Sequence, residues 1–317
     1  MAGSGDIRHE VLTRLTGLRL HQHQGRRAPH KPLLVLLALA RLAEHGSSEL
    51  SWSTTHERLS DLLAEFGPPS RTGRTQSAAY PFTRLRTDGV WLLDRDVPMD
   101  LITPLTEHDP NGRLVPELET ALRRDRALLH TVARTLVESH FPATVAPDVL
   151  LAAGLDPDVV LAAGLDPDVV LAAGTAADAT RGRRRNPRWR GAVLAAWDRQ
   201  CAFCGYDGQL GSASAGLDAA HVRWFAYDGP DELDNGLALC VLHHKLFDLG
   251  VVGLDRALRI EVSDTFTART AAGRAVYELH GREVRPRRPG NPGPAAEHVS
   301  WHRREVFKGS PLAAAPR

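Results

Sequence analysis

All three cysteines of the chain fall into one repeated spacing that is typical of a metal site. Cys201 and Cys204 are separated by two residues, and so are Cys240 and His243. Thiolate and imidazole ligands at this spacing can reach one ion from two tight turns, and four such ligands suit tetrahedral Zn²⁺. Three incidental buried thiols would leave the matching spacing unexplained. We therefore predict a closed structural zinc site, which stabilises a small fold and performs no chemistry itself.

Further histidine, carboxylate and amide residues lie between and beside these two pairs. They occur in three short segments, at 218–221 (DAAH), 234–236 (DNG) and 243–248 (HHKLFD). Together with the cysteines, the pattern resembles the motif of HNH endonucleases, in the variant with two zinc knuckles that McrA-like restriction enzymes share. The resemblance implies a ββα-metal fold, in which His221 is the histidine of the first strand and His244 is the final histidine. It also implies that Asn235 is a structural residue, which fixes the loop and so orients His221.

The resemblance implies a one-metal mechanism that suits these residue types. The neutral imidazole of His221 can take a proton from water, so that hydroxide attacks the scissile phosphorus. His244 can hold one divalent cation (Mg²⁺, Mn²⁺ or a similar ion), which neutralises the phosphate and stabilises the leaving 3′ oxygen. The second ligand of this cation stays open, because Ala220 stands where many HNH proteins have an aspartate. The candidates are Asp218 and Asp248, of which Asp248 lies four residues after His244 on the same helix face.

A strongly basic segment directly precedes this cluster. Residues 181–190 (RGRRRNPRWR) hold six arginines and one tryptophan. Such a run in a linker is usually solvated, but beside a nuclease motif it favours contact with DNA phosphates, which is independent of base sequence and sensitive to salt. We therefore expect contacts to the DNA backbone from Arg183, Arg184, Arg185, Arg188 and Arg190.

Near the N-terminus, a second basic group lies at the start of a predicted helix. Residues 26–32 (RRAPHKP) run into an apolar helix over 33–45, and a helix N-terminus beside cationic side chains is a natural phosphate site. Arg71 and Arg74 follow, and then the block YPFTRLRTDGVW at 80–91. Together these segments resemble the sulfur-binding domain of restriction enzymes that attack phosphorothioate-modified DNA. In that family the domain stands N-terminal to an HNH module, which is the order found in this sequence.

The resemblance implies a site for a non-bridging sulfur atom, which is larger, softer and less hydrated than oxygen. An apolar cup made by Pro81 and the ring of Tyr80 could accept this atom at little desolvation cost, although both residues could instead pack in the core. The remaining phosphate charge and nearby base edges would be held by the basic group at the helix start, Arg26, Arg27, His30 and Lys31. An arginine could also read guanine, and the sequence leaves the choice open among Arg71, Arg74 and Arg84.

The order of predicted elements indicates an α+β protein with separate domains. A mostly helical DNA-reading domain with a small sheet is expected over 1–145. Its helices are predicted at 6–20, 33–45, 54–66 and over most of 114–141, and a strand at 90–93. A decapeptide, PDVLLAAGLD, recurs between 147 and 174, and with the basic linker it makes up a helical region over 146–185. Its unit is too short for a solenoid, which favours a duplication at a domain boundary. The HNH domain follows at 186–260, and an extension at 261–317.

The bulk composition narrows the class of protein. The formal net charge of the 317 residues is +1, so nucleic-acid binding must come from local basic patches rather than from the overall charge. The chain begins without the apolar region of a signal peptide, and its apolar runs are too short to cross a membrane. We therefore expect a cytoplasmic protein with no membrane partner.

These features together predict a modification-dependent (type IV) restriction endonuclease that binds double-stranded, phosphorothioated DNA. One HNH site cuts one strand at a time, so cleavage of both strands favours a homodimer. Two other functions fit parts of the sequence. One is an HNH endonuclease that reads another modified base or unmodified DNA, and the other is a non-catalytic, zinc-stabilised DNA-binding protein. The intact set of His221, Asn235 and His244 argues against the latter.

Overall fold

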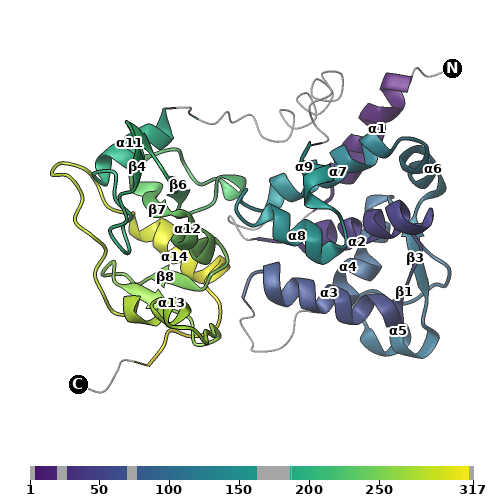
Figure 1. Cartoon of the computed structure of the whole chain (residues 1–317). Coiled ribbons are helices and arrows are strands. Elements are labelled where there is room, and N and C mark those ends of the chain that lie inside the picture. The colour runs from purple at the N-terminus through teal and green to yellow at the C-terminus, as the bar shows by residue number, and fades with distance from the viewer. Residues whose placement is uncertain (1–3, 20–26, 70–76, 163–185, 187, 314–317) are drawn as a thin grey trace. The chain divides into compact units, whose positions relative to one another are not determined.

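The computed structural model describes residues 4–19, 27–69, 77–162, 186 and 188–313. The chain divides into two compact units, Met1–Arg183 and Arg184–Arg317 (Figure 1). Both contain helices and small antiparallel sheets, which confirms the predicted α+β class. Within the described parts of the chain, no helix is long and apolar enough to cross a membrane.

The N-terminal unit is built around one helix that is buried on all sides. This helix, α2 (His30–His45), packs against helices from later parts of the sequence. Its central segment, LLVLLALA at 33–40, is apolar on every face, and a helix of this kind belongs in a core. It ends at Gly46, whose φ of 73° is the left-handed conformation that glycine adopts freely. The helix predicted over 33–45 is therefore confirmed, with three further residues at its start.

The N-terminal unit contains several other helices in addition to α2. They are α1 (Ser4–Thr16), α3 (Trp52–Phe66), α4 (Ala79–Arg84), the 3₁₀ helix η1 (Leu85–Asp88), α5 (Ile102–His108), α6 (Pro116–Arg124), α7 (Arg126–His140), α8 (Ala146–Ala153) and α9 (Pro157–Ala162). The segment 114–141, predicted to be mostly helical, forms two helices, α6 and α7, and the Asp125 side chain caps α7 by accepting from the amide of Leu128. The first helix ends at Thr16 rather than at 20. The first copy of the decapeptide forms α8 and the second starts α9, whereas the third lies outside the described residues.

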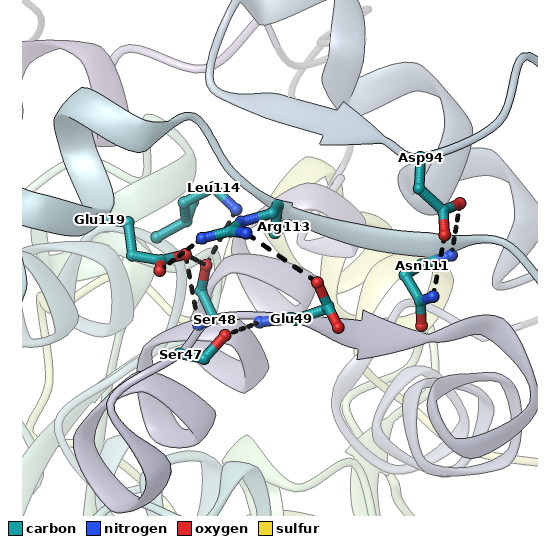
Figure 2. Close-up of polar contacts among 8 residues, drawn as sticks. All are labelled: Ser47, Ser48, Glu49, Asp94, Asn111, Arg113, Leu114 and Glu119. Carbon is teal, nitrogen blue, oxygen red and sulfur yellow. Dashed lines mark hydrogen bonds and ion pairs between the residues drawn. The ribbon is translucent and has the colours of Figure 1, made fainter.

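A three-stranded antiparallel sheet packs beside these helices, in the order β1 (Leu50–Ser51), β3 (Asn111–Leu114) and β2 (Trp91–Leu93). The strand predicted over 90–93 is therefore confirmed. A buried carboxylate joins the sheet to α6, as Figure 2 shows. Glu119 accepts a hydrogen bond from Arg113 Nη2 at 2.7 Å and a further one from the Ser48 hydroxyl. The Ser48 hydroxyl oxygen in turn accepts from the amide of Leu114 at 3.0 Å. This network satisfies polar groups that would otherwise be buried without partners.

The C-terminal unit contains the predicted ββα arrangement. Strands β6 (Leu217–His221) and β7 (Gly236–Cys240) pair in antiparallel register, and α12 (Val241–Asp248) follows β7 directly and packs against both. Helix α11 (Trp189–Ala196) also packs on this pair of strands. It approaches closely at Gly236, where a Cβ atom would lie 2.5 Å from Val193 Cγ2. The register places His221 opposite Gly236, and therefore brings the end of β6 next to the residue that follows Asn235.

The remaining elements complete the same unit. They are β4 (Gln209–Leu210), β5 (Ala213–Ser214), η2 (Phe225–Tyr227), η3 (Leu233–Asn235), β8 (Val252–Leu254), β9 (Ile260–Val262), α13 (Ala271–Arg274), η4 (Tyr277–Leu279) and α14 (Ala296–Glu305). The segment that we expected as an extension contributes Val276, Leu279 and Val299 to the core that also contains the strands β6 and β7. Helix α14 packs against β8.

Candidate functional site

The four residues of the predicted zinc site converge in the structure. Their ligand atoms all lie within 4.8 Å of one another. The Nδ1 atom of His243 lies 3.5 Å from Cys201 Sγ and 3.2 Å from Cys240 Sγ. In a tetrahedral site with ordinary Zn–S and Zn–N bonds, neighbouring ligand atoms are about 3.5–3.8 Å apart, so this set fits the ion. The turn at the first pair is completed by Gly205, whose φ is 78°.

The protonation of the thiols also points to a cation. The hydrogen bond with Cys240 is the main cause that lowers the pKa of the Cys201 thiol to about 3. The same hydrogen bond raises the pKa of Cys240, and burial is the main cause that raises the pKa of Cys204. The three thiols are thus close enough to affect one another's protonation. A bound cation would stabilise all of them as thiolates, and protons would be released when it binds.

His221 occupies the last position of β6, and two side chains hold its ring. Its Nε2 atom lies 2.7 Å from Asp231 Oδ1. The indole of Trp189 stacks on the imidazole, with ring centroids 3.8 Å apart and planes 16° from parallel. Asp231 was not predicted from the sequence. The only available signal was its position in the polar segment GPDELDN, between His221 and Asn235.

Asn235 closes the loop that follows His221. Its Oδ1 atom accepts from the amide of Arg223 at 2.7 Å. Its Nδ2 atom donates to the carbonyl oxygens of Arg223 at 3.0 Å and Pro230 at 2.9 Å. Asn235 is fully buried, so these hydrogen bonds tie the two ends of the loop together away from solvent. The resemblance implied that Asn235 orients His221, and the loop that these contacts hold begins directly after His221.

His244 lies on α12 beside Asp248, one turn later. Their Nε2 and Oδ2 atoms are 3.2 Å apart, and both side chains are largely buried. Burial lowers the pKa of His244, but the charge and hydrogen bond of Asp248 and the charge of Asp218 outweigh it, so that the pKa is raised. A cation at this position would compete with a proton for Nε2, because only the neutral imidazole can bind it. The neighbouring His243 faces the thiols, so the two adjacent histidines belong to different sites.

Asp218 has a different environment from Asp248. It lies three residues before His221 on β6, so alternation along the strand directs the two side chains to opposite faces. Its Oδ1 atom accepts from Arg190 Nε at 2.6 Å. Among the described residues, the cysteine–histidine cluster is the only set of three or more metal-ligand atoms that lie this close to one another. Asp218, His244 and Asp248 therefore do not form a second such set. Of the two candidate second ligands, Asp248 is the one in contact with His244.

The basic residues expected at the DNA backbone are only partly described. Arg190 forms the ion pair with Asp218, and Arg188 is exposed at the start of α11. Arg183, Arg184 and Arg185 lie outside the described residues. Beside Arg188 a cavity of about 430 Å³ is lined in part by Trp189 and Asp231, the two residues that hold His221.

In the N-terminal unit, the predicted sulfur cup lies on α4. The ring of Tyr80 meets the ring of His30 edge to face, with centroids 5.9 Å apart. Tyr80 and His30 are partly exposed, whereas Pro81 is buried. Tyr80 and His30 therefore form an aromatic pair at the surface of the domain, whereas Pro81 is buried next to Tyr80.

Three of the cationic residues expected to contact DNA have partners within the domain. The Lys31 ammonium donates to Asp88 Oδ2 at 2.5 Å and to the Arg19 carbonyl at 2.9 Å. Arg27 is buried and donates to the Phe66 carbonyl at 2.5 Å. Arg84 forms a surface ion pair with Asp100, and this hydrogen bond is the main cause that raises its pKa. Arg26, Arg71 and Arg74 lie outside the described residues.

Comparison with protein families identifies both units. Residues 8–158 match the ScoMcrA-like DNA sulfur-binding domain, and residues 201–255 match the HNH endonuclease. None of the curated proteins is significantly similar to the chain. Among solved structures, the sulfur binding domain of SprMcrA complexed with phosphorothioated DNA is 24% identical, covering 48% of this chain and 97% of that chain, with a TM-score of 0.39. The type IV phosphorothioation-dependent restriction endonuclease ScoMcrA is 15% identical over 74% of this chain and 81% of that chain, with a TM-score of 0.36.

The chain thus carries an HNH endonuclease domain, which supports a metal-dependent DNA nuclease. More specifically, it joins a ScoMcrA-like DNA sulfur-binding domain at its N-terminal side to an HNH endonuclease domain at its C-terminal side. Both domains, and their order, were predicted from the sequence motifs and are confirmed.

The cysteine–histidine cluster yields a test of metal content. We expect one Zn²⁺ per chain by mass spectrometry, and Cys240→Ser should lose it. The C-terminal unit should then unfold at a lower temperature, because the binding energy of a structural zinc, about 10–16 kcal/mol in small zinc peptides, is folding energy. His244→Ala is the control and should keep its zinc. Full zinc content in Cys240→Ser would contradict the assignment of this ligand.

The contact between Asp231 and His221 yields a kinetic test. Asp231→Asn keeps the size of the side chain but removes the charge that orients Nε2. We expect the single-turnover rate of DNA cleavage to fall by about 100-fold, within the range that a correctly oriented general base contributes. DNA affinity measured in EDTA should stay the same. Asp228→Asn, an exposed change in the same loop, is the control. An equal effect of both substitutions would rule out a specific role for Asp231.

Proposed function

We propose that this protein is a modification-dependent (type IV) restriction endonuclease, which binds phosphorothioated DNA through residues 1–145 and cuts nearby phosphodiester bonds through residues 186–260. The observation that carries the proposal is the occurrence in one chain of a DNA sulfur-binding domain and an HNH domain whose three motif residues are positioned by neighbours. Residues 146–185 then link the two activities. The enzyme would act in the cytoplasm, where DNA is accessible to it.

In the cleavage step, His221 is the general base. Asp231 accepts from Nε2–H, which selects the neutral tautomer with its lone pair on Nδ1. This lone pair takes a proton from water, and the resulting hydroxide attacks phosphorus. Stacking of Trp189 limits rotation of the ring, and Asn235 holds the loop behind it. When bound at His244 and Asp248, a divalent cation such as Mg²⁺ or Mn²⁺ would neutralise the phosphate and stabilise the leaving 3′ oxygen.

The ligand chemistry favours different ions for the two metal sites. Three thiolates and one imidazole form a soft, closed set, which suits structural Zn²⁺. The imidazole–carboxylate pair of His244 and Asp248 is harder and more open, and it suits a catalytic cation that keeps water ligands. Asp218 would join the second site only if Arg190 released it.

For recognition of the modification, we propose that the apolar surface around Tyr80, Pro81 and His30 receives the sulfur atom. Sulfur is weakly hydrated, so an apolar contact selects it over oxygen at little desolvation cost. Lys31 and Arg27 would support this site from below, because their charges have partners inside the domain. The phosphates and base edges would then be contacted by the more peripheral arginines, Arg26, Arg71, Arg74 and Arg84 in this domain and Arg183, Arg184, Arg185, Arg188 and Arg190 before the HNH domain.

The test of this function uses one plasmid prepared with and without phosphorothioate linkages, each incubated with Mg²⁺, Mn²⁺ or EDTA. We expect cleavage of the modified plasmid alone, and only with a cation. His244→Ala should abolish cleavage and leave binding to modified DNA unchanged. Equal cleavage of both plasmids would contradict recognition of sulfur. Binding of modified DNA without cleavage under any cation would contradict a catalytic role.

Double-strand cleavage adds a requirement on assembly. Because each HNH domain holds one candidate catalytic site, we propose that two copies of the chain act together on one DNA duplex. Analytical ultracentrifugation of His244→Ala with a modified duplex should detect two protein chains per duplex. A strictly one-to-one complex, together with double-strand cleavage by the wild-type protein, would contradict the dimer.

A further inference from the structure

The buried side of Asp248 contacts a tryptophan that neither the HNH motif nor the proposed mechanism uses. One carboxylate oxygen of Asp248, Oδ2, faces His244 at 3.2 Å. The other, Oδ1, accepts a hydrogen bond from Trp224 Nε1 at 3.1 Å. Both Asp248 and Trp224 are 3% exposed, so water cannot readily replace this contact. We propose that Trp224 is a positioning residue for the catalytic cation site, and that the C-terminal helix α14 holds it in place. The proposal rests on the proposed function, because it concerns the same pair of ligands.

The indole can act in only one way on this carboxylate. Its N–H is a donor without acceptor capacity, so Asp248 Oδ1 is the acceptor in this contact. By binding Oδ1, it leaves Oδ2 directed at His244. When a side chain binds a metal through one atom, a hydrogen bond to its other polar atom orients the side chain and contributes to metal affinity. Trp224 therefore favours the rotamer of Asp248 that directs Oδ2 toward His244.

Helix α14 fixes the position of Trp224. The ring of Trp301 lies 5.9 Å from the rings of both Trp224 and Tyr227, measured between centroids. These three aromatic residues and Val306 form a small buried cluster of their own. Packing in this cluster limits the rotation of the indole about its side-chain bonds. The direction of Trp224 Nε1 is thus decided by residues about 75 positions later in the chain.

The same helix also holds the backbone beside Asp248. His302 stacks on Phe247, with ring centroids 3.8 Å apart and planes 10° from parallel. The Nε2 atom of His302 lies 3.0 Å from the Phe247 carbonyl oxygen and donates to it. The last turn of α12 is therefore held at residue 247 by His302 and at residue 248 by Trp224. Residues beyond 260 would in this way form part of the support for the cation site.

The experiment measures cation binding rather than cleavage. Mn²⁺ is titrated into the zinc-loaded, full-length protein without DNA, and free Mn²⁺ is followed by electron paramagnetic resonance. We expect Trp224→Phe to weaken Mn²⁺ binding by about tenfold or more, the range found when partners of metal ligands are removed. Zinc content and DNA affinity in EDTA should match the wild type. Unchanged Mn²⁺ affinity in Trp224→Phe would overturn the proposal.

Trp197→Phe is the matched control. Trp197 is also buried, lies in the same unit and donates through Nε1 to the Gly236 carbonyl oxygen at 3.1 Å, but it is not part of the contacts around Asp248. It should lose packing and one hydrogen bond without any change in Mn²⁺ affinity. If both variants lose Mn²⁺ affinity equally, the loss in Trp224→Phe comes from general destabilisation of the unit. This outcome also overturns the proposal.

Two further arms separate the possible failures. If His244→Ala leaves Mn²⁺ affinity unchanged, the proposed cation site itself is wrong. If His244→Ala abolishes binding and Trp224→Phe does not weaken it, the site stands and only the positioning role fails. If Trp224→Phe does not fold, β-(3-benzothienyl)alanine at position 224 replaces the N–H by sulfur at nearly the same shape. The same loss of Mn²⁺ affinity is then expected from removal of the donor alone.

Discussion

Convergence of four ligand atoms at the cysteine–histidine cluster constrains the whole C-terminal unit. Cys201 and Cys204 follow α11, whereas Cys240 ends β7 and His243 lies in the first turn of α12. An ion held by this set would join these segments at a single point, and its binding energy would be folding energy. Since Cys240 is the residue at which the strand becomes a helix, the cluster also fixes where α12 begins. The position and direction of His244 and Asp248 follow from that start.

Two histidine–carboxylate pairs then have different tasks in the same small domain. Asp231 holds Nε2 of His221 at the end of a strand, next to the stacked ring of Trp189. Asp248 holds His244 within a helix and is itself held by Trp224. In the proposed mechanism, the first arrangement orients an imidazole for proton transfer, and the second gathers an anionic oxygen and a nitrogen for a cation. The environment of each carboxylate, rather than its type, determines which task the neighbouring histidine can perform.

In the N-terminal unit, two of the cationic residues expected at a nucleic-acid site are buried and have partners inside the domain. The buried ion pair of Lys31 and Asp88 binds both polar backbone groups of Arg19, through the Lys31 ammonium and the Asp88 carboxylate. Arg27 is fixed between the Phe66 carbonyl and the ring of Phe141. Charges buried in this way must have partners, since an unpaired buried charge costs several kcal/mol, roughly 3–5 when one partner of a buried pair is removed. Under the proposed function they contribute a rigid base, and contact with DNA then depends on residues closer to solvent.

Much of this protein could be read from local patterns. The ββα arrangement was predicted from the spacing of the cysteines and from the order of His221, Asn235 and His244. The core helix of the N-terminal unit was predicted from the apolar segment of α2. Both kinds of signal are local, because ligand spacing and helical periodicity act over a few residues. The partners of those residues could not be read in the same way. The members of these pairs lie far apart in sequence or on different elements. The pairs are Asp231 with His221, Trp224 with Asp248, Arg190 with Asp218, and Asp88 with Lys31. Such pairs form only where packing brings polar groups together and each must find a partner, so only the tertiary structure shows that Asp248 contacts His244 while Asp218 contacts Arg190.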